Sequence, residues 1–281
     1  TSGDGFYPAA AEDGSGGALI AWTEIAYLPS TKTEIRVQKV NSGGAPQWTA
    51  DGVVLVDSSV VGGSTVWQTG ETTAAVAGDG SGGAYVAWND WRNDPTPPIG
   101  NDDVYAQRVN ASGVAQWTSG GISLPDYLPG SQRRPKMVSD LAGGALVTFQ
   151  DKGGYSWDIS LVRLTSAGKA WFRWPLWDSS AENKDQTDPR IIYDASGAAP
   201  AGCVVVWKAE SLELGAQKVQ MGETASSVVT VTATDLIAGE PGTGEGTGTF
   251  TFYRSGSTAA ELTVNFTVGG TATSGSDYTA L

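Results

Sequence analysis

The sequence predicts an all-β protein built mainly from repeated units, and three observations support this prediction. An acidic, Gly-rich turn followed by an apolar strand that ends in an aromatic residue occurs four times in the first 220 residues. An alternating apolar and polar phrase follows each copy, and glycine is abundant, with 38 among 281 residues. Short strands that repeat about every 55 to 70 residues are typical of β-propeller blades.

Each copy of the first phrase begins at an aspartate. The copies run from Asp13 to Trp22, Asp79 to Trp88, Asp140 to Phe149 and Asp194 to Trp207. We expect these aspartates to cap their own turns, with calcium binding as the alternative. The apolar run after each turn predicts a strand covered on both faces. Its aromatic residue predicts a wedge between neighbouring blades, with a sugar-stacking platform as the alternative.

The second phrase predicts an amphipathic strand, a hairpin turn and an outer strand. Ile35–Val40 and Val104–Val109 alternate with a period of two, and Asn41–Gly44 and Asn110–Gly113 have the residues of hairpin turns. Residues 1–221 are therefore predicted to form a β-propeller-like repeat domain of about four four-stranded blades. The blades are expected at about 7–60, 72–127, 134–180 and 187–221, with tryptophans closing their outer edges at Trp48, Trp117 and Trp171.

The turn Asp-x-Ser-Gly-Gly ahead of an aromatic strand resembles the Asp-box turn of sialidase-type and other propellers. The whole unit, with its later Tyr-Ala-Gln-Arg-Val, is similar to the repeats of bacterial cell-surface propellers over residues 7–221. This resemblance implies the fold and carries no catalytic residues with it.

The pattern changes near residue 222. Alternating strands at Val228–Ala233, Thr249–Tyr253 and Leu262–Val268 predict a sandwich. The segment Gly269–Leu281 resembles the Calx-β domain, an immunoglobulin-like β-sandwich, so residues 222–281 are predicted to be its N-terminal part. The remaining strands are expected from a longer chain or from a partner.

The Calx-β resemblance implies a metal site. It implies that Glu240 and Asp277 form part of a calcium site, the only cofactor that we expect. These two residues supply too few oxygens for a complete calcium shell. Since the family also contains calcium-free domains, both states stay open.

Composition excludes several classes of partner and site. The formal net charge of −13 argues against nucleic acid and anionic membranes as partners, because both require clustered basic residues. The absence of histidine excludes a Ser-His-Asp triad and most zinc and copper sites. The single cysteine, Cys203, lies in an apolar run and is expected to be buried. No run of 18 apolar residues occurs, so no membrane insertion is expected for this segment.

Irregular loops are the expected location of ligand-binding residues, because scaffolds carry recognition on their loops. The loops at 91–103 and 178–188 interrupt the repeat. Acids that follow the repeated aromatics (Glu24, Asp90 and Asp151) are expected to pair locally, with a ring of carboxylates as the alternative. The ligand-binding candidates are Trp91, Arg92, Asp94, Asp102, Asp103, Trp174 and Trp177.

Together these observations predict a non-catalytic, secreted or cell-surface structural or adhesion protein, not an enzyme. Its partners are expected to be an extracellular protein or glycan, or copies of itself that pair through open β edges. A carbohydrate-binding propeller module is the alternative. A glycoside hydrolase or lyase built on a propeller is the third hypothesis, since such enzymes need two suitably placed carboxylates.

Overall fold

The computed structural model describes residues 4–26, 32–57, 74–90, 92, 102–124, 130–152, 156–176, 185–194, 202–209, 214–219, 228–235 and 249–255. These residues form strands, turns and connecting segments and contain no helix, so the prediction of an all-β protein is confirmed. The chain divides into two compact units, Thr1–Ala216 and Gln217–Leu281.

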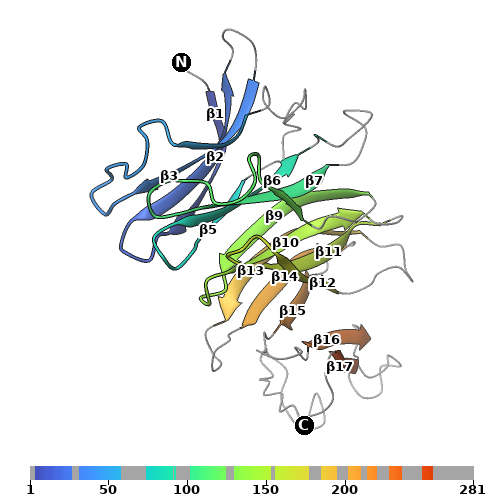
Figure 1. Ribbon diagram of the computed structural model, residues 1–281. Helices are drawn as coiled ribbons and strands as arrows, with labels where there is room; N and C mark the ends of the chain where they lie inside the picture. Colours follow the sequence, from blue (N-terminus) through green and yellow to red (C-terminus); the bar gives the residue numbers. More distant parts are fainter. Residues whose placement is uncertain are drawn as a thin grey trace. The chain divides into compact units, whose positions relative to one another are not determined.

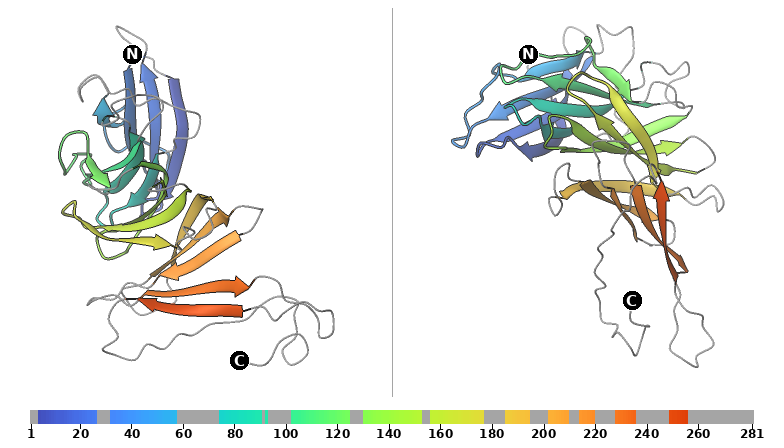
Figure 2. Two further views of the ribbon diagram at one scale, coloured as in Figure 1. Left: turned by 90° about the vertical axis from the view of Figure 1, so that its right-hand side faces the viewer. Right: turned by 60° about the horizontal axis from the view of Figure 1, so that its bottom comes forward.

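The first unit consists of four antiparallel sheets, each a meander in chain order (Figures 1 and 2). Sheet one contains β1 (Asp4–Glu12), β2 (Ala18–Ala26), β3 (Lys32–Val40) and β4 (Val53–Asp57). Sheet two contains β5 (Ala75–Gly78), β6 (Ala84–Asp90), β7 (Asp103–Val109) and β8 (Ile122–Leu124). Sheet three contains β9 (Ser131–Ser139), β10 (Ala145–Lys152), β11 (Asp158–Leu164) and β12 (Ala170–Leu176). Sheet four contains β13 (Gln186–Asp194), β14 (Gly202–Ala209) and β15 (Leu214–Val219).

The second unit contains one antiparallel pair among the described residues. Its strands are β16 (Val228–Asp235) and β17 (Thr249–Ser255). They match the first two strands that alternation predicts for this segment. The third, Leu262–Val268, lies outside the described residues, as do Glu240 and Asp277.

The core of the first unit lies between neighbouring sheets. The first strands of the sheets contact one another in series, β1 with β5, β5 with β9 and β9 with β13. Strand β6 is buried on both faces, as its apolar sequence predicts: Trp88 packs in the cluster shared with sheet one, and Tyr85 packs in the cluster shared with sheet three. Phe149 joins this second cluster. The wedge role predicted for Trp88 and Phe149 is therefore confirmed.

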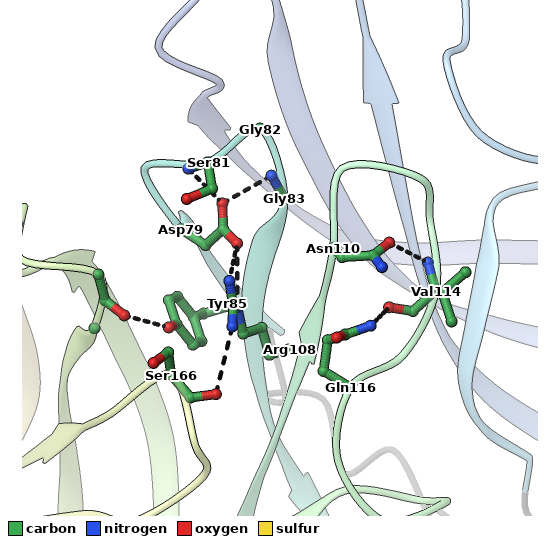
Figure 3. A network of polar contacts seen from close by, with 12 residues as sticks. Asp79, Ser81, Gly82, Gly83, Tyr85, Arg108, Asn110, Val114, Gln116 and Ser166 are labelled. Atoms are coloured by element: carbon green, nitrogen blue, oxygen red, sulfur yellow. Dashed lines mark hydrogen bonds and ion pairs between the residues drawn. The ribbon is translucent and has the colours of Figure 1, made fainter.

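The aspartates of the first three repeated turns cap those turns, as predicted, and the turn after Asp194 lies outside the described residues. In the second copy, Asp79 Oδ1 accepts the backbone N–H groups of Ser81 and Gly83, each at 2.8 Å. Its Oδ2 accepts from Arg108 on β7 at 2.8 Å (Figure 3). The turns at Asp13 and Asp140 repeat this arrangement, with Lys39 and Arg163 as the cations. A Cβ on Gly83 would lie 2.2 Å from the carbonyl oxygen of Val109, so glycine is required there.

Two of the outer tryptophans link their sheet to the next one. Trp48 Nε1 donates to the carbonyl oxygen of Ala111, and Trp117 Nε1 donates to that of Ser166. Both acceptors are in the hairpin turn of the following sheet. The glycine of each turn has a positive φ and lies against the indole, so that a Cβ on Gly113 would be 2.9 Å from Trp48. The sequence predicted only that these tryptophans close the outer edge of a blade. The structure shows that Trp48 and Trp117 join successive sheets.

Candidate functional site at the bulges of the first strands

Three of the first strands carry the same irregularity. Strands β1, β9 and β13 each place two residues opposite one aromatic residue of the next strand, which is a β-bulge. The pairs are Tyr7–Pro8 opposite Trp22, Arg134–Pro135 opposite Phe149, and Asp188–Pro189 opposite Trp207. The bulges therefore lie at the repeated aromatic position. Each of these strands is nine residues long, and the bulge supplies one of the nine.

The first residue of each bulge has a left-handed backbone. The φ angles are 51° at Tyr7, 54° at Arg134 and 55° at Asp188, and none of these residues is glycine. Each precedes a proline, which disfavours helical backbone angles in the residue before it. Such conformations cost roughly 1–3 kcal/mol each and concentrate at functional sites. The bulges are therefore the place in the first unit where we look for function.

Buried amide side chains support two of these bulges. Asn89 Oδ1, at the end of β6, accepts the backbone N–H of Arg134 at 3.2 Å. Gln150 Oε1, at the matching position of β10, accepts the backbone N–H of Asp188 at 3.3 Å. Asn89 and Gln150 are both buried, so each sheet fixes the strained residue of the next sheet. The residue that follows the repeated aromatic therefore fixes the backbone of a bulge in two successive sheets.

An ion pair joins the bulges of β9 and β13, which lie next to each other (Figure 1). The guanidinium of Arg134 pairs with the carboxylate of Asp188. Both side chains are partly exposed, at 24% for Arg134 and 46% for Asp188. The pair is therefore accessible to a ligand while its backbone is fixed.

A second, buried network lies beneath the bulge of β9. Asp102 is 2% exposed and accepts from Arg133 Nε at 2.7 Å and from Asn89 Nδ2 at 3.1 Å. Asn89 Nδ2 also donates to the carbonyl oxygen of Gln132. Asp151 accepts from Ser160 Oγ at 3.1 Å in the next sheet. The carboxylates of Asp102 and Asp151 therefore hold β9, the strand that presents Arg134, since Asp151 also accepts from Gln132 Nε2 at 3.3 Å.

Two further basic residues are close in sequence to the Arg134–Asp188 pair. On β9, Lys136 follows the bulge, opposite Thr148, and is partly buried. Burial, followed by the charges of Arg190 and Arg134, lowers the pKa of the Lys136 ammonium. Arg190 of β13 is exposed. Both strands therefore carry a basic residue two positions after the strained residue of the bulge.

Three of the ligand-binding candidates that the sequence predicted have side chains in the described part of the structure, and each has a different environment. Asp102 belongs to the buried network under the β9 bulge, where it holds Arg133. Arg92 pairs with Asp90, as predicted for Asp90, and its guanidinium lies 3.9 Å from the centroid of the Tyr105 ring. Asp103 begins β7 opposite Asp90 and is partly buried. These three residues are not brought together at the bulges.

The other predicted candidates cannot be placed by their side chains. Trp174 is in β12 opposite Leu161, and its side chain is outside the described part of the structure. Trp91, Asp94 and Trp177 lie outside the described residues altogether.

Sequence reasoning missed Arg134, Lys136 and Arg190, and it included Asp188 only as the last residue of the loop at 178–188 without naming it as a candidate. Two signals were present. A proline recurs at the same distance before the acidic turn in the first, third and fourth units, in Phe6-Tyr7-Pro8, Arg133-Arg134-Pro135 and Thr187-Asp188-Pro189. In addition, three of the chain's 17 basic residues are concentrated in Arg133-Arg134-Pro135-Lys136. A charged residue before a repeated proline was the available indication.

Metal ligands do not gather in the part of the chain that the structure describes, which holds no group of three or more His, Cys, Asp or Glu residues suited to a metal ion. Across the same residues, no helix is long and apolar enough to cross a membrane.

Nine chains of solved structures match this chain, including the following two. One is an α-L-arabinanase from Penicillium chrysogenum in complex with arabinobiose, at a TM-score of 0.47 and 14% identity, covering 80% of this chain and 68% of the arabinanase chain. The other is an endo-1,4-β-xylanase from Bacteroides thetaiotaomicron, at a TM-score of 0.33 and 8% identity, covering 76% and 75%. No protein-family model and no curated protein matches the chain.

Both of these structures are of enzymes, and this finding contradicts the prediction of a non-catalytic structural or adhesion protein. The prediction that the chain is not an enzyme was wrong for the same reason. It relied on the absence of histidine and of alignable catalytic residues, and neither excludes chemistry that needs only Asp or Glu. At these TM-scores the likeness supplies no residue correspondences, so the function is argued from the residues of this chain.

Proposed function

We propose that the first unit is a β-propeller whose sheets are blades, and that it binds and cleaves a carbohydrate chain at the bulges of its first strands. Four meanders in chain order, with first strands in serial contact, support the propeller architecture. A propeller presents the irregular features of its innermost strands to a ligand. The bulges of β9 and β13 are such features.

The observation that carries the proposal is the partly exposed Arg134–Asp188 pair on two adjacent strained bulges. A guanidinium supplies only donors and a carboxylate only acceptors, so together they complement sugar hydroxyls, which do both. The side-chain oxygens of Asn89 and Gln150 accept the backbone N–H groups of Arg134 and Asp188, and so fix these two residues before a ligand arrives. Such preorganisation favours a binding or catalytic site over a merely structural ion pair.

Cleavage of a glycosidic bond uses two carboxyl groups, one as general acid and the other as base or nucleophile. We assign Asp188 to one of these roles, because its side chain is 46% exposed and Arg134 orients it. Asp102 is not assigned, since it is 2% exposed and held by Arg133. In the same way Asp151 is held by Ser160. The partner of Asp188 is not among the carboxylates of the buried network.

The proposal is tested by incubating the full chain with a panel of polysaccharides that includes arabinan, xylan and polyuronates. Release of new reducing ends is measured, together with binding by affinity electrophoresis. Asp188→Asn is expected to abolish cleavage while the protein stays folded. Asp51→Asn, which removes a carboxylate from an exposed turn, is the matched control and is expected to leave cleavage unchanged.

Failure to bind or cleave any polysaccharide would overturn the proposal. If the chain binds a polysaccharide without cleaving it, and Asp188→Asn weakens that binding, the result would instead support the carbohydrate-binding module that the sequence also predicted.

For the second unit, a Calx-β-like sandwich and secretion of the protein stay proposals. The β16–β17 pair is compatible with the sandwich, and calcium binding at Glu240 and Asp277 is tested by calorimetric titration with calcium.

A further inference from the structure

Successive sheets of the first unit meet through one kind of interface, which joins sheets one and two, two and three, and three and four. The second strand of each sheet alternates between two faces. The receiving face carries the repeated aromatic residue and packs against the preceding sheet, as Trp88 does against sheet one. The donating face carries the alternate residues and packs against the following sheet, as Tyr85 does against sheet three. Each interface therefore consists of one donating face and one receiving face.

The receiving face is buried in three sheets and partly exposed in sheet one. Its second-strand residues in sheets two, three and four are all buried: Ala84, Val86 and Trp88, then Ala145, Val147 and Phe149, then Cys203, Val205 and Trp207. The matching residues of sheet one are Ala18, Ile20 and Trp22, and they are only partly buried. Val54 of β4 lies on the same face, because it and Trp22 are both opposite Arg36, and it is 41% exposed.

The donating face is buried in three sheets and partly exposed in sheet four. Its second-strand residues in sheets one, two and three are buried: Leu19, Ala21 and Thr23, then Tyr85, Ala87 and Asn89, then Leu146, Thr148 and Gln150. In sheet four, Val204 and Val206 are only partly buried and Lys208 is exposed. Ile192 of β13 lies opposite Val204, and it is 63% exposed. The chain therefore has one exposed copy of each half of its own repeated interface.

These two faces do not cover each other within the chain. Among the described strands, the extensive contacts between first strands run from β1 through β5 and β9 to β13 and do not return to β1. An apolar sheet face gains free energy when another layer covers it. Because both halves of the interface are present in every molecule, a second copy of the chain can supply the layer that each face lacks.

The hairpin turn of sheet one also has the shape of a receiving turn. Its Gly44 has a φ of 80°, close to the 79° of Gly113 and the 77° of Gly168. A Cβ on Gly113 would lie 2.9 Å from Trp48, and one on Gly168 would lie 3.0 Å from Trp117, whereas a Cβ on Gly44 would meet nothing within 4 Å. The described residues of sheet four include no tryptophan at the position of Trp48, so the strands provide the contact that we consider.

The charges of the two exposed faces are opposite in sign. The strand register places more acids than bases on the receiving face of sheet one, namely Glu12, Glu24, Glu34 and Asp57 with Lys32 and Arg36. It places Arg190 and Lys208 on the donating face of sheet four, with Asp194 at the turn as the acid. Opposite charges on two surfaces favour their encounter and fix their register.

We propose that the receiving face of sheet one binds the donating face of sheet four in a second copy of this chain. The inference rests on the propeller architecture of the proposed function and is independent of carbohydrate cleavage. The contact is heterologous, because two different faces meet. In a dimer it occurs twice and closes a ring of eight sheets, twice the four of one chain. A ring of this size falls within the range of about four to eight blades that is typical of propellers.

Sedimentation-velocity ultracentrifugation of the full chain over a wide range of concentration tests the proposal. The expected species has twice the chain mass of 29.0 kDa and dissociates on dilution. Ile20→Lys on the receiving face and Val206→Glu on the donating face each introduce a charge into the contact. Each is expected to weaken association by at least about a hundredfold, because the new charge is buried opposite residues of the same sign.

Mixing the two variants distinguishes a heterologous contact from a symmetric one. The donating face of Ile20→Lys and the receiving face of Val206→Glu are both intact, so the mixture is expected to form dimers that neither variant forms alone. Circular dichroism checks that each variant is folded. Val54→Lys and Ile192→Glu are the second pair of variants, because both side chains are exposed and their replacement leaves the core intact.

Val114→Lys and Val114→Glu are the matched controls. They place the same charges at a valine that is 55% exposed in the hairpin turn of sheet two, away from both faces. Both controls are expected to associate as the unchanged chain does.

A monomer at every concentration would overturn the inference, as would a dimer that all four face variants leave unchanged. A dimer disrupted by variants of only one face would show a symmetric contact and would also overturn it. Larger species that the same variants abolish would support the head-to-tail contact and show that it continues without closing. Polysaccharide cleavage by a monomeric chain would refute this inference and leave the proposed activity standing, whereas a dimer that cleaves no polysaccharide would do the reverse.

Discussion

Replacing Asp79 tests how the repeated turn stabilises the sheets. Asp79 is 1% exposed on its side chain and holds the N–H groups of Ser81 and Gly83 and the guanidinium of Arg108. In Asp79→Ala the buried N–H of Gly83 loses its partner, which costs about 1–3 kcal/mol, whereas water can replace the bond to the exposed Ser81. Arg108 is 21% exposed, so loss of its carboxylate adds about 1–2 kcal/mol, less than for a fully buried pair.

The expected loss in the free energy of unfolding is therefore about 2–5 kcal/mol for Asp79→Ala. Asp79→Asn keeps an oxygen for the turn and loses only the charge opposite Arg108, so about 1–2 kcal/mol is expected. Urea unfolding followed by tryptophan fluorescence and circular dichroism measures both losses.

Asp13→Ala is the internal control, because the first turn is more exposed and its cation, Lys39, lies 3.4 Å away. A smaller loss is expected there. The reasoning is refuted if Asp79→Asn destabilises the protein as much as Asp79→Ala does, or if Asp13→Ala is the most destabilising variant of the three.

Four further predictions concern other parts of the first unit. Trp117→Phe removes the bond to Ser166 and keeps an aromatic ring, so urea unfolding should show a loss of about 0.5–1.5 kcal/mol. Leu141 has a φ of 53° where the first two turns have Gly14 and Gly80, and it is 67% exposed. Leu141→Asn should therefore stabilise the protein by about 1 kcal/mol, and a lower unfolding midpoint would contradict this. Burial, followed by the charges of Asp79 and Asp140, raises the pKa of Tyr85 from 10.0 to about 12 despite Arg108. The folded state holds the phenol proton of Tyr85 more tightly than the unfolded state does. The stability that this proton contributes is therefore complete below pH 10 and is lost as pH rises to about 12. Tyr85→Phe should flatten this decline in the free energy of unfolding at alkaline pH. Burial raises the pKa of the Cys203 thiol to about 12. A thiol reagent at neutral pH should therefore react with Cys203 only as fast as sheet four opens. Immediate labelling of the native protein would contradict the buried position of this residue.

Much of the fold could be predicted from the sequence because the repeat is made of local signals. The turn at Asp79 and the apolar run ending at Trp88 specify their own hydrogen bonds and burial, and both were predicted correctly. The link from Trp48 to Ala111 was predicted only as the closing of an edge. Its acceptor is 63 residues away in sequence, and no local pattern identifies it.

The site could not be predicted in the same way. Arg134 and Asp188 are 54 residues apart and meet because two bulges lie on adjacent strands. A bulge leaves little trace in sequence beyond the proline that follows it, and its left-handed residue is not glycine here. The loop at 91–103 attracted attention because it interrupts the repeat. Its described residues Arg92 and Asp102 turned out to hold Asp90 and Arg133 in place.

The most direct test of the central claim is a crystal structure of the full chain with a bound oligosaccharide, chosen as the tightest binder among arabino-, xylo- and galacturono-oligosaccharides. The sugar is expected beside the first strands of sheets three and four, with hydrogen bonds to Arg134 and Asp188. A sugar bound only elsewhere, with the Arg134–Asp188 pair unchanged and untouched, would contradict the claim that these bulges form the carbohydrate site.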